Sequence, residues 1–414
     1  MLVVIYFLVL LFFFFKLKKE NTIRRWVFGL YTFSAFLSVL YPFFMPVNYD
    51  QDVLAYVYYT ICTLCLLYPI WYMGNKNCSN FIFPAKFINW TSYVLILFGI
   101  IAMVNILPQI FTLRTFLNNM SEVRDAYYKG DPLAETDKSF IFIVANWVTY
   151  IQFFSPIFAF LKFIQKDKII AYLLCVVSLV PAFDKLLIGE REASVVVLSN
   201  FVFAYLFFKP ILSNEIVSKV RKIGLCIISP FAVFIIAMSI ARFGDSDGGT
   251  FGGLLAYGGE QPYNFSYFFS KIRIDQQYIG GKLSFGYLFP LNEQLDGKIN
   301  DYIQAGEYLN VFAGIPGTFL LDFGYFAIFV VLIMSISFLL IFKQKPNKVT
   351  KKNNFSTFMA FLIYYQIIFM GIFYYDFTTK YVVIMCFILF IVYYIIQIIY
   401  KTKKTNNISF QCPH

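Results

Sequence analysis

A short polar turn between two long apolar segments holds five charged residues in nine positions. They are Asp184, Lys185, Glu190, Arg191 and Glu192. A charge at the centre of a bilayer costs about 2.5–3.5 kcal/mol on insertion scales, so charges beside membrane segments usually pair, line a cavity or form a site. A guanidinium suits phosphate because it binds two oxygens at once and stays charged. We therefore predict that Arg191 faces an anionic substrate; the alternative is a turn whose charges pair and face water.

A second group of reactive side chains lies in the stretch 242–321, which is polar in an otherwise apolar chain. This stretch holds 14 of the 22 glycines, so much of its backbone is expected to turn. Its charged and aromatic residues include Arg242, Glu260, Tyr263, Arg273 and Tyr278. Aromatic faces beside acids and arginines suit sugar rings, although aromatic belts are also normal at membrane interfaces. We predict that this stretch binds a polar substrate.

The sequence gives little support to metal or histidine chemistry. Asp245-Ser246-Asp247 and Asp50-Gln51-Asp52 have the D-x-D spacing with which some glycosyltransferases hold metal-bound nucleotide sugars. Gly248-Gly249 marks the first as a turn. Both pairs lie in loops that are expected on the outer face of a membrane, as argued below, where no nucleotide sugar is expected, so we predict no metal and no cofactor. The single histidine is His414, which excludes histidine bases and His metal sites within one chain.

The composition indicates which elements must position these residues. The chain is 59% hydrophobic and 14% charged, with a mean hydropathy of +0.68, whereas soluble domains have roughly 25% charged residues. Apolar runs of about 20 residues predict membrane-spanning helices instead of the short alternating strands of a barrel. The net charge of +11 falls in clusters between these runs, which is typical of an orientation signal and not of nucleic-acid binding. We expect a single all-α polytopic membrane domain over residues 1–414.

Eleven segments are long enough to be predicted spans. They lie near residues 2–16, 26–47, 53–73, 87–107, 140–164, 169–188, 193–208, 223–241, 322–342, 355–375 and 381–400. The loops on one side hold 21 Lys and Arg in 67 positions and those on the other side 12 in 131, which predicts that the first side is cytoplasmic. The N-terminus is then outside and the C-terminus cytoplasmic.

Two larger loops, 108–139 and 242–321, are then expected on the outer face. The first has a helical pattern over 110–123, which predicts a helix along the membrane surface with Arg124 beside it. The second ends in an apolar piece at 310–321 that is too short to span, so we predict a re-entrant or interfacial segment. Asp322 would follow at the outer mouth of the next helix.

Three sequence features resemble one known family. The first is a G-x-R stretch that opens an apolar helix, Gly189-Glu190-Arg191-Glu192-Ala193-Ser194-Val195. The second is the outer loop that begins at Arg242 and contains Tyr278-Ile279-Gly280-Gly281. The third is Asn310-Val311-Phe312, followed by Asp322-Phe323-Gly324. Together they cover about residues 184–342 and resemble the Wzy-type polymerases of bacterial surface polysaccharides, also called O-antigen or oligosaccharide repeat-unit polymerases.

The resemblance implies a reaction, a location and partners. A growing glycan is transferred from undecaprenyl pyrophosphate onto a lipid-linked oligosaccharide repeat unit by a metal-independent, GT-C-like glycosyltransferase. The protein would lie in the bacterial cytoplasmic (inner) membrane, with its active site facing the periplasm or exterior. Its partners would be undecaprenyl-pyrophosphate-linked oligosaccharides, membrane lipid, and a chain-length regulator and flippase of the same pathway.

Roles follow from the chemistry that the resemblance implies. The leaving pyrophosphate gains negative charge, so fixed arginines lower the barrier; we expect Arg191 and Arg242 there. A carboxylate can take the proton of the attacking hydroxyl. The candidates are Glu192, Glu260 and Asp322, which the sequence does not rank. The expected substrate-binding residues are Arg273, Tyr278, Asn310, Tyr263 and Arg124.

Other functions remain as alternatives. A flippase or transporter of lipid-linked oligosaccharide would also need polar groups in a membrane protein, but the repeated halves common in transporters are not detectable here. An O-antigen ligase-like glycosyltransferase shares the architecture but relies on a loop histidine, which this sequence lacks. A non-catalytic assembly partner is a third alternative.

Overall fold

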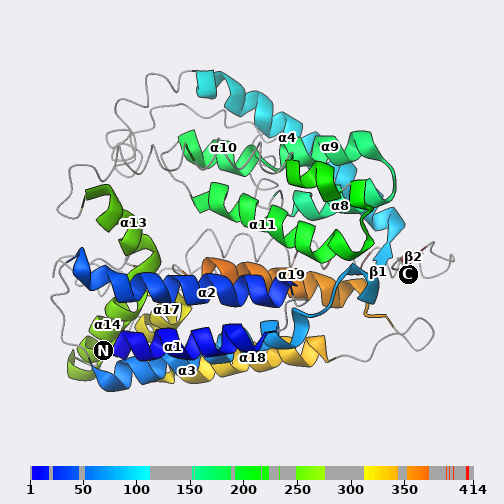
Figure 1. The fold of residues 1–414 in the computed structure, drawn as a ribbon. Coiled ribbons are helices and arrows are strands. Elements are labelled where there is room, and N and C mark those ends of the chain that lie inside the picture. Colours follow the sequence, from blue (N-terminus) through cyan, green and yellow to red (C-terminus); the bar gives the residue numbers. More distant parts are fainter. Residues whose placement is uncertain are drawn as a thin grey trace. The chain divides into compact units, whose positions relative to one another are not determined.

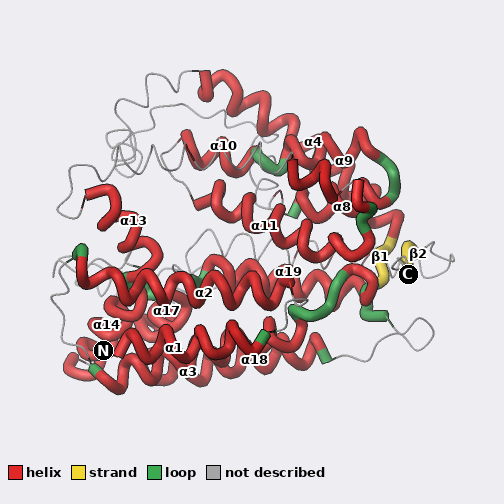
Figure 2. Tube along the Cα trace, viewed as in Figure 1, coloured by secondary structure: helices red, strands yellow, loops and turns green. Residues whose placement is uncertain are grey.

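The computed structural model describes the following parts of the chain. They are residues 2–17, 22–45, 52–111, 154–187, 192–215, 217–222, 249–275, 312–343, 352–372 and 407–409, together with 152, 233, 388, 391 and 395. Most of these residues are helical, as Figures 1 and 2 show. Their contacts group into two compact units, here called unit 1 and unit 2.

Unit 1 is a bundle whose long helices run side by side (Figure 1). Its elements are α1 (Leu2–Lys16), α2 (Thr22–Leu40), η1 (Tyr41–Phe43), α3 (Val53–Met73), α13 (Gly249–Gly259), α14 (Gln261–Asp275), α17 (Gly314–Phe323), η4 (Gly324–Phe326), α18 (Ala327–Phe342) and the later part of α19 (Phe355–Met370). α2 packs against α1 and α13, while α3 packs against α18 and α14.

Unit 2 is also mainly helical. Its elements are η2 (Cys78–Asn80), β1 (Ile82–Pro84), α4 (Ala85–Phe111), α8 (Ser155–Ile164), α9 (Lys168–Val177), α10 (Val180–Leu187), α11 (Glu192–Phe208), η3 (Lys209–Ile211), the start of α19 and β2 (Asn407–Ser409). α4 packs against α8, α9 and α10, and α11 packs against α8 and α10. β1 and β2 form a two-stranded antiparallel sheet in which Phe83 lies opposite Ile408. The sequence pattern does not predict this strand pair.

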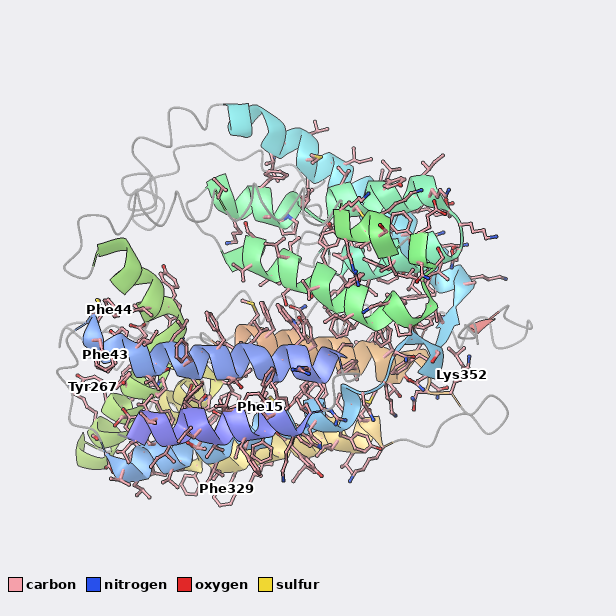
Figure 3. The ribbon with its side chains drawn as sticks, in the orientation of Figure 1. Phe15, Phe43, Phe44, Tyr267, Phe329 and Lys352 are labelled. Atoms are coloured by element: carbon pink, nitrogen blue, oxygen red, sulfur yellow. The ribbon has the colours of Figure 1, made fainter. Side chains whose placement is uncertain are left out.

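Five of the described helical stretches are long and apolar enough to cross a membrane. They are Ile23–Phe43, Val53–Met73, Ala85–Ile106, Ala193–Ile211 and Gly314–Phe342. These helices and α1 leave large apolar side chains exposed, including Phe15 at 71% and Phe329 at 57% (Figure 3). Apolar surface on this scale needs an apolar surrounding. The protein is therefore a helical, membrane-embedded protein, as the composition predicts.

Two predicted spans have the same ends in the structure. α1 covers 2–16 and α3 covers 53–73. α3 begins where the Asp52 carboxylate accepts the N–H of Leu54 at 2.8 Å, an N-cap that satisfies a free donor at the start of the helix. It ends at Gly74, whose N–H donates to the carbonyl of Ile70 at 2.8 Å.

Two other predicted spans differ from the structure: one is interrupted, and the other begins later than predicted. The span predicted at 169–188 is broken at residues 178–179, between α9 and α10. Pro181 follows the break, and proline has no N–H for the helical bond to Val177. The span predicted at 322–342 begins as α18 at Ala327, because the chain first turns through η4, where Gly324 has φ +57. The predicted spans near 223–241 and 381–400 lie almost wholly outside the described residues.

Candidate functional site

The structure describes only part of the predicted site. The side chains of Glu260, Tyr263 and Asp322 are described. Glu192 and Arg273 lie on described helices, at the start of α11 and near the end of α14, but their side chains lie outside the description. The remaining predicted residues lie outside the described stretches: Arg191, Arg242, Tyr278, Asn310 and Arg124.

Glu260 lies at the junction of α13 and α14, in unit 1. The junction is held close to α2 by two glycines that precede it. A Cβ on Gly259 would meet the carbonyl oxygen of Leu37 at 2.7 Å, so only glycine allows the two backbones to approach this closely. The carbonyl of Gly258 accepts a hydrogen bond from the Ser34 hydroxyl at 2.6 Å. The small residues before Glu260 thus anchor its backbone to α2.

Tyr263 fixes the first turn of α14 to the same helix. Its hydroxyl donates to the carbonyl of Ser38 at 2.9 Å, and its ring packs against those of Tyr41 and Tyr56 at 5.5 and 6.4 Å between centroids. The side chain is only 4% exposed. Tyr263 therefore anchors α14 to α2, and its predicted role in substrate binding stays a prediction.

The Glu260 carboxylate and Asn264 hold the main chain of Phe312 from both sides. Glu260 Oε1 accepts the N–H of Phe312 at 3.2 Å, and Asn264 Nδ2 donates to the carbonyl of Phe312 at 3.0 Å. The ring of Tyr257 adds a contact with the Phe312 ring, at 4.7 Å between centroids. Phe312 comes two residues before α17, so these contacts fix how the chain enters that helix. We call Glu260, Asn264 and Phe312 the Phe312 clamp.

Burial gives Glu260 an unusual protonation equilibrium. Burial raises the pKa of the carboxyl group to about 7, and the hydrogen bonds from Phe312 and Asn264 oppose this only in part. The residue as a whole is half-buried, so it is not sealed in the interior of unit 1. A carboxylate with a pKa near neutrality can take up or release a proton at physiological pH, which an ordinary glutamate does poorly.

Asp322 has a different environment from Glu260. It is the second-last residue of α17, and its side chain has 0% exposure. The sequence predicts Asp322 at the outer mouth of the next helix, where substrate could reach it. In the structure it lies in the interior of unit 1, inside the segment that starts at the clamp. A substrate could reach it only if this packing changed.

The charged turn 184–192 belongs to unit 2. Asp184 and Lys185 lie in the last turns of α10 and are half-buried, and Glu192 is the first residue of α11. α10 and α11 pack against each other, so the two helices that flank the turn are brought together. Arg191 itself lies outside the described residues, and its predicted role stays a prediction.

Two members of the clamp were not recognised as functional from the sequence. The sequence assigns no role to Asn264 or Phe312, although Phe312 is part of the Asn310-Val311-Phe312 motif. A signal was present: Glu260 and Asn264 are four residues apart, which is one helical turn, in a stretch that the structure shows to be the start of α14. The many glycines of the stretch predict a loop instead, and they obscure this helical spacing.

No protein-family model matches this chain, and no curated protein or solved structure matches it either. Among the residues that the structure describes, no three His, Cys, Asp or Glu side chains gather closely enough to hold a metal ion.

Proposed function

We propose that this protein is a membrane glycosyltransferase that polymerises lipid-linked oligosaccharide repeat units on the outer face of a bacterial cytoplasmic membrane. The observation that carries the proposal is the half-buried Glu260 carboxylate, placed on the main chain of Phe312 at the entry to α17. The sequence motifs that resemble repeat-unit polymerases support the same function. One of them, Asn310-Val311-Phe312, ends in the residue that Glu260 contacts.

The proposed reaction gives Glu260 a defined step. The hydroxyl of the acceptor repeat unit attacks the anomeric carbon of the growing glycan, and a new carbon–oxygen bond forms. The bond between that carbon and the pyrophosphate oxygen breaks, and undecaprenyl pyrophosphate leaves with the bonding electrons. Glu260 takes the proton of the attacking hydroxyl, which makes this oxygen a stronger nucleophile as the bond forms.

The proposal places positively charged side chains at the leaving group. Arg191 and Arg242 would stabilise the negative charge that develops on the pyrophosphate, with Arg273 as a third donor. Tyr278, Asn310 and Arg124 would contact the oligosaccharide. Holding both lipid-linked substrates near one membrane face supplies the orientation that the transfer needs.

Among the three candidate bases, Glu260 is favoured on physical grounds. A base must come within hydrogen-bond distance of the proton that it accepts. Glu260 is only half-buried as a residue, whereas Asp322 is fully enclosed. Glu192 remains a candidate through its position at the start of α11.

Elongation by the purified protein tests this function. The full chain is reconstituted in vesicles with lipid-linked repeat units and no nucleotide or divalent metal, and the products are sized by gel electrophoresis. We expect ladders of polymer from the wild type and none from Arg191→Ala at an equal protein level. Glu215→Gln is the control, because Glu215 is 75% exposed and pairs with Lys219. No elongation by a folded wild type, or full activity of Arg191→Ala, would contradict the proposal.

One observation also favours a transporter. A carboxylate with a pKa near 7 is suited to proton-coupled transport as well as to base catalysis. A flippase of lipid-linked oligosaccharide would move labelled lipid between the leaflets of the same vesicles without lengthening the glycan. Movement without elongation would select this alternative.

A further inference from the structure

The ends of three helices meet in unit 1 at the end that the Lys and Arg distribution predicts to be cytoplasmic. The N–H of Arg24, in the first turn of α2, donates to the carbonyl of Gly74 after α3 at 3.3 Å. A Cβ on Gly74 would meet Cα of Arg24 at 3.0 Å, so the two chain segments are in direct contact. Phe14, in the last turn of α1, packs on Gly29 of α2. The last turns of α1 and α3 therefore flank the first turn of α2.

Three cations at this junction lie over aromatic rings. Arg24 Cζ is 5.1 Å from the Trp71 ring centroid, Arg25 Cζ is 5.1 Å from that of Phe14, and Lys16 Nζ is 4.4 Å from that of Phe12. The Trp71 ring is itself fixed by edge contacts with Phe13 and Phe28, at 5.8 and 5.6 Å between centroids. The rings hold the cations in place without neutralising them. We call Lys16, Arg24 and Arg25 the basic cluster.

Arg24 has a donor that the described residues leave unused. Its Nε is enclosed by protein atoms but has no hydrogen-bond partner among the residues that the structure describes. A donor on a charged group that loses water without gaining an acceptor destabilises the folded state. Arg24 as a whole is only half-buried, so an acceptor outside the protein approaches the terminal nitrogens of the guanidinium, and Nε becomes available to it only if the side chain turns.

The position of the basic cluster indicates what that acceptor is. Arg24 is the second residue of the candidate span Ile23–Phe43, and Trp71 is the third-last residue of Val53–Met73. Tryptophan and arginine at the ends of spans mark the headgroup level of a bilayer. Phe43 and Phe44, with exposures of 78% and 48%, lie with Tyr267 at the other end of unit 1 (Figure 3). The cluster thus lies where lipid phosphates are the abundant anions.

We propose that the basic cluster is a binding site for the phosphate of an anionic phospholipid headgroup, with Arg24 as its main donor. The planar guanidinium of Arg24 can offer its two terminal nitrogens to two phosphate oxygens at once. Arg25 and Lys16 supply the further positive charge that distinguishes an anionic from a zwitterionic headgroup. The bound lipid would hold the ends of α1, α2 and α3 together. This site is separate from the Phe312 clamp and does not depend on the proposed reaction.

Lipid binding to the full chain in a neutral detergent tests the site. The protein is titrated with phosphatidylglycerol, phosphatidylcholine or inorganic phosphate. Native mass spectrometry counts the bound lipid, and the unfolding midpoint is followed in parallel. We expect phosphatidylglycerol to bind at least tenfold more tightly than phosphatidylcholine and to raise the midpoint, and millimolar phosphate to have little effect.

Variants locate the binding. Arg24→Gln should weaken phosphatidylglycerol binding about tenfold. Arg24→Lys keeps the positive charge but loses the guanidinium that can bind two oxygens at once, so we expect an intermediate affinity. This variant also shows whether a folded protein with a different donor still binds the lipid. Lys343→Gln, an exposed cation at the end of α18, is the matched control and should bind as the wild type does.

Three outcomes would overturn the proposal. The first is equal binding of phosphatidylglycerol and phosphatidylcholine. The second is unchanged phosphatidylglycerol binding in both Arg24 variants. The third is a midpoint shift with inorganic phosphate equal to that with phosphatidylglycerol, which would assign the site to a free anion and not to a lipid.

Discussion

A charged side chain lies near each end of α2, and the two differ in whether their hydrogen bonds are made within the protein. Near its end, Ser34, Leu37 and Ser38 hold the α13–α14 junction, where the Glu260 carboxylate accepts a main-chain hydrogen bond within the protein. At its start, Arg24 keeps a donor without a partner among the described residues. Arg24 and Ser38 are 14 residues apart, and an α-helix rises about 1.5 Å per residue, so the two regions are separated by roughly 20 Å.

This difference in hydrogen bonding indicates whether a buried charge serves the fold or binds a ligand. A charge whose hydrogen bonds are made inside the protein fixes the local fold and has its pKa set by that fold. A charge whose hydrogen bonds are incomplete indicates an external ligand, because leaving a donor unused costs free energy. On this basis the Phe312 clamp is a preorganised protein site and the basic cluster is half of a binding site.

The largest expected effect is on the rate of elongation and concerns Glu260. Glu260→Gln keeps an acceptor for the Phe312 N–H but cannot take a proton, so elongation should fall about 100-fold or more. In the wild type the rate should rise with pH through about 7, because the base acts only when ionised. The rate is measured from pH 5.5 to 8.5 in reconstituted vesicles. Wild-type activity of the Gln variant at pH 7 would remove Glu260 from the reaction.

A second prediction concerns stability and has the opposite dependence on pH. The pKa of Glu260 is about 7 in the folded protein, above its ordinary value of 4.5, so burial favours the neutral acid. Its contribution to stability is complete below pH 4.5 and is lost as pH rises to about 7, by up to about 3 kcal/mol.

The Gln variant isolates this contribution because its side chain does not titrate. The unfolding midpoint of the wild type should fall relative to that of Glu260→Gln between pH 4.5 and 7.5, in the same detergent. Parallel midpoints across this range would show that the carboxyl group does not resist ionisation in the folded state.

A third prediction concerns the close approach of α13 to α2. In Gly259→Ala the new Cβ meets main-chain atoms of Leu37 and Ser38 at 2.7–2.9 Å, so α13 must move. We expect a loss of about 1–3 kcal/mol in unfolding free energy, together with a lower apparent pKa in the pH–rate profile as Glu260 becomes more exposed.

Gly252→Ala is the control for this change. Its Cβ would meet the Met45 sulfur at 2.9 Å, and the flexible Met45 side chain can move away. Equal effects of the two substitutions on the midpoint and on the pH–rate profile would contradict the role assigned to Gly259.

The smallest expected effect is on lipid binding and concerns the basic cluster. Trp71→Phe leaves a weaker ring beneath Arg24, and the lost cation–π attraction of roughly 0.5–1 kcal/mol should weaken phosphatidylglycerol binding about two- to fivefold. Trp26→Phe is the matched control, because the Trp26 N–H donates to the Tyr365 hydroxyl at 3.2 Å instead of supporting a cation. A larger effect of the Trp26 change on lipid binding would place the site elsewhere.

Several parts of the fold could be predicted from local pattern. The apolar runs at 2–16 and 53–73 are helices with those ends, because a run that must satisfy every backbone group inside a bilayer has few other conformations. The break before Pro181 follows the same logic and could have been predicted, since proline lacks the helical N–H. The helices α13 and α14 were missed because their glycines and polar residues are typical of loops.

The sequence by itself determined that this is a helical membrane protein and which residues were chemically able to act. It could not rank Glu192, Glu260 and Asp322, because three carboxylates of the same type differ only in their surroundings. Tertiary structure decided that Asp322 is enclosed and that Glu260 meets Phe312, 52 residues further along the chain. It also brought Trp71 beneath Arg24. Burial and hydrogen-bond partners set the pKa and reach of a charged group, and both arise from contacts between distant segments that local sequence does not encode.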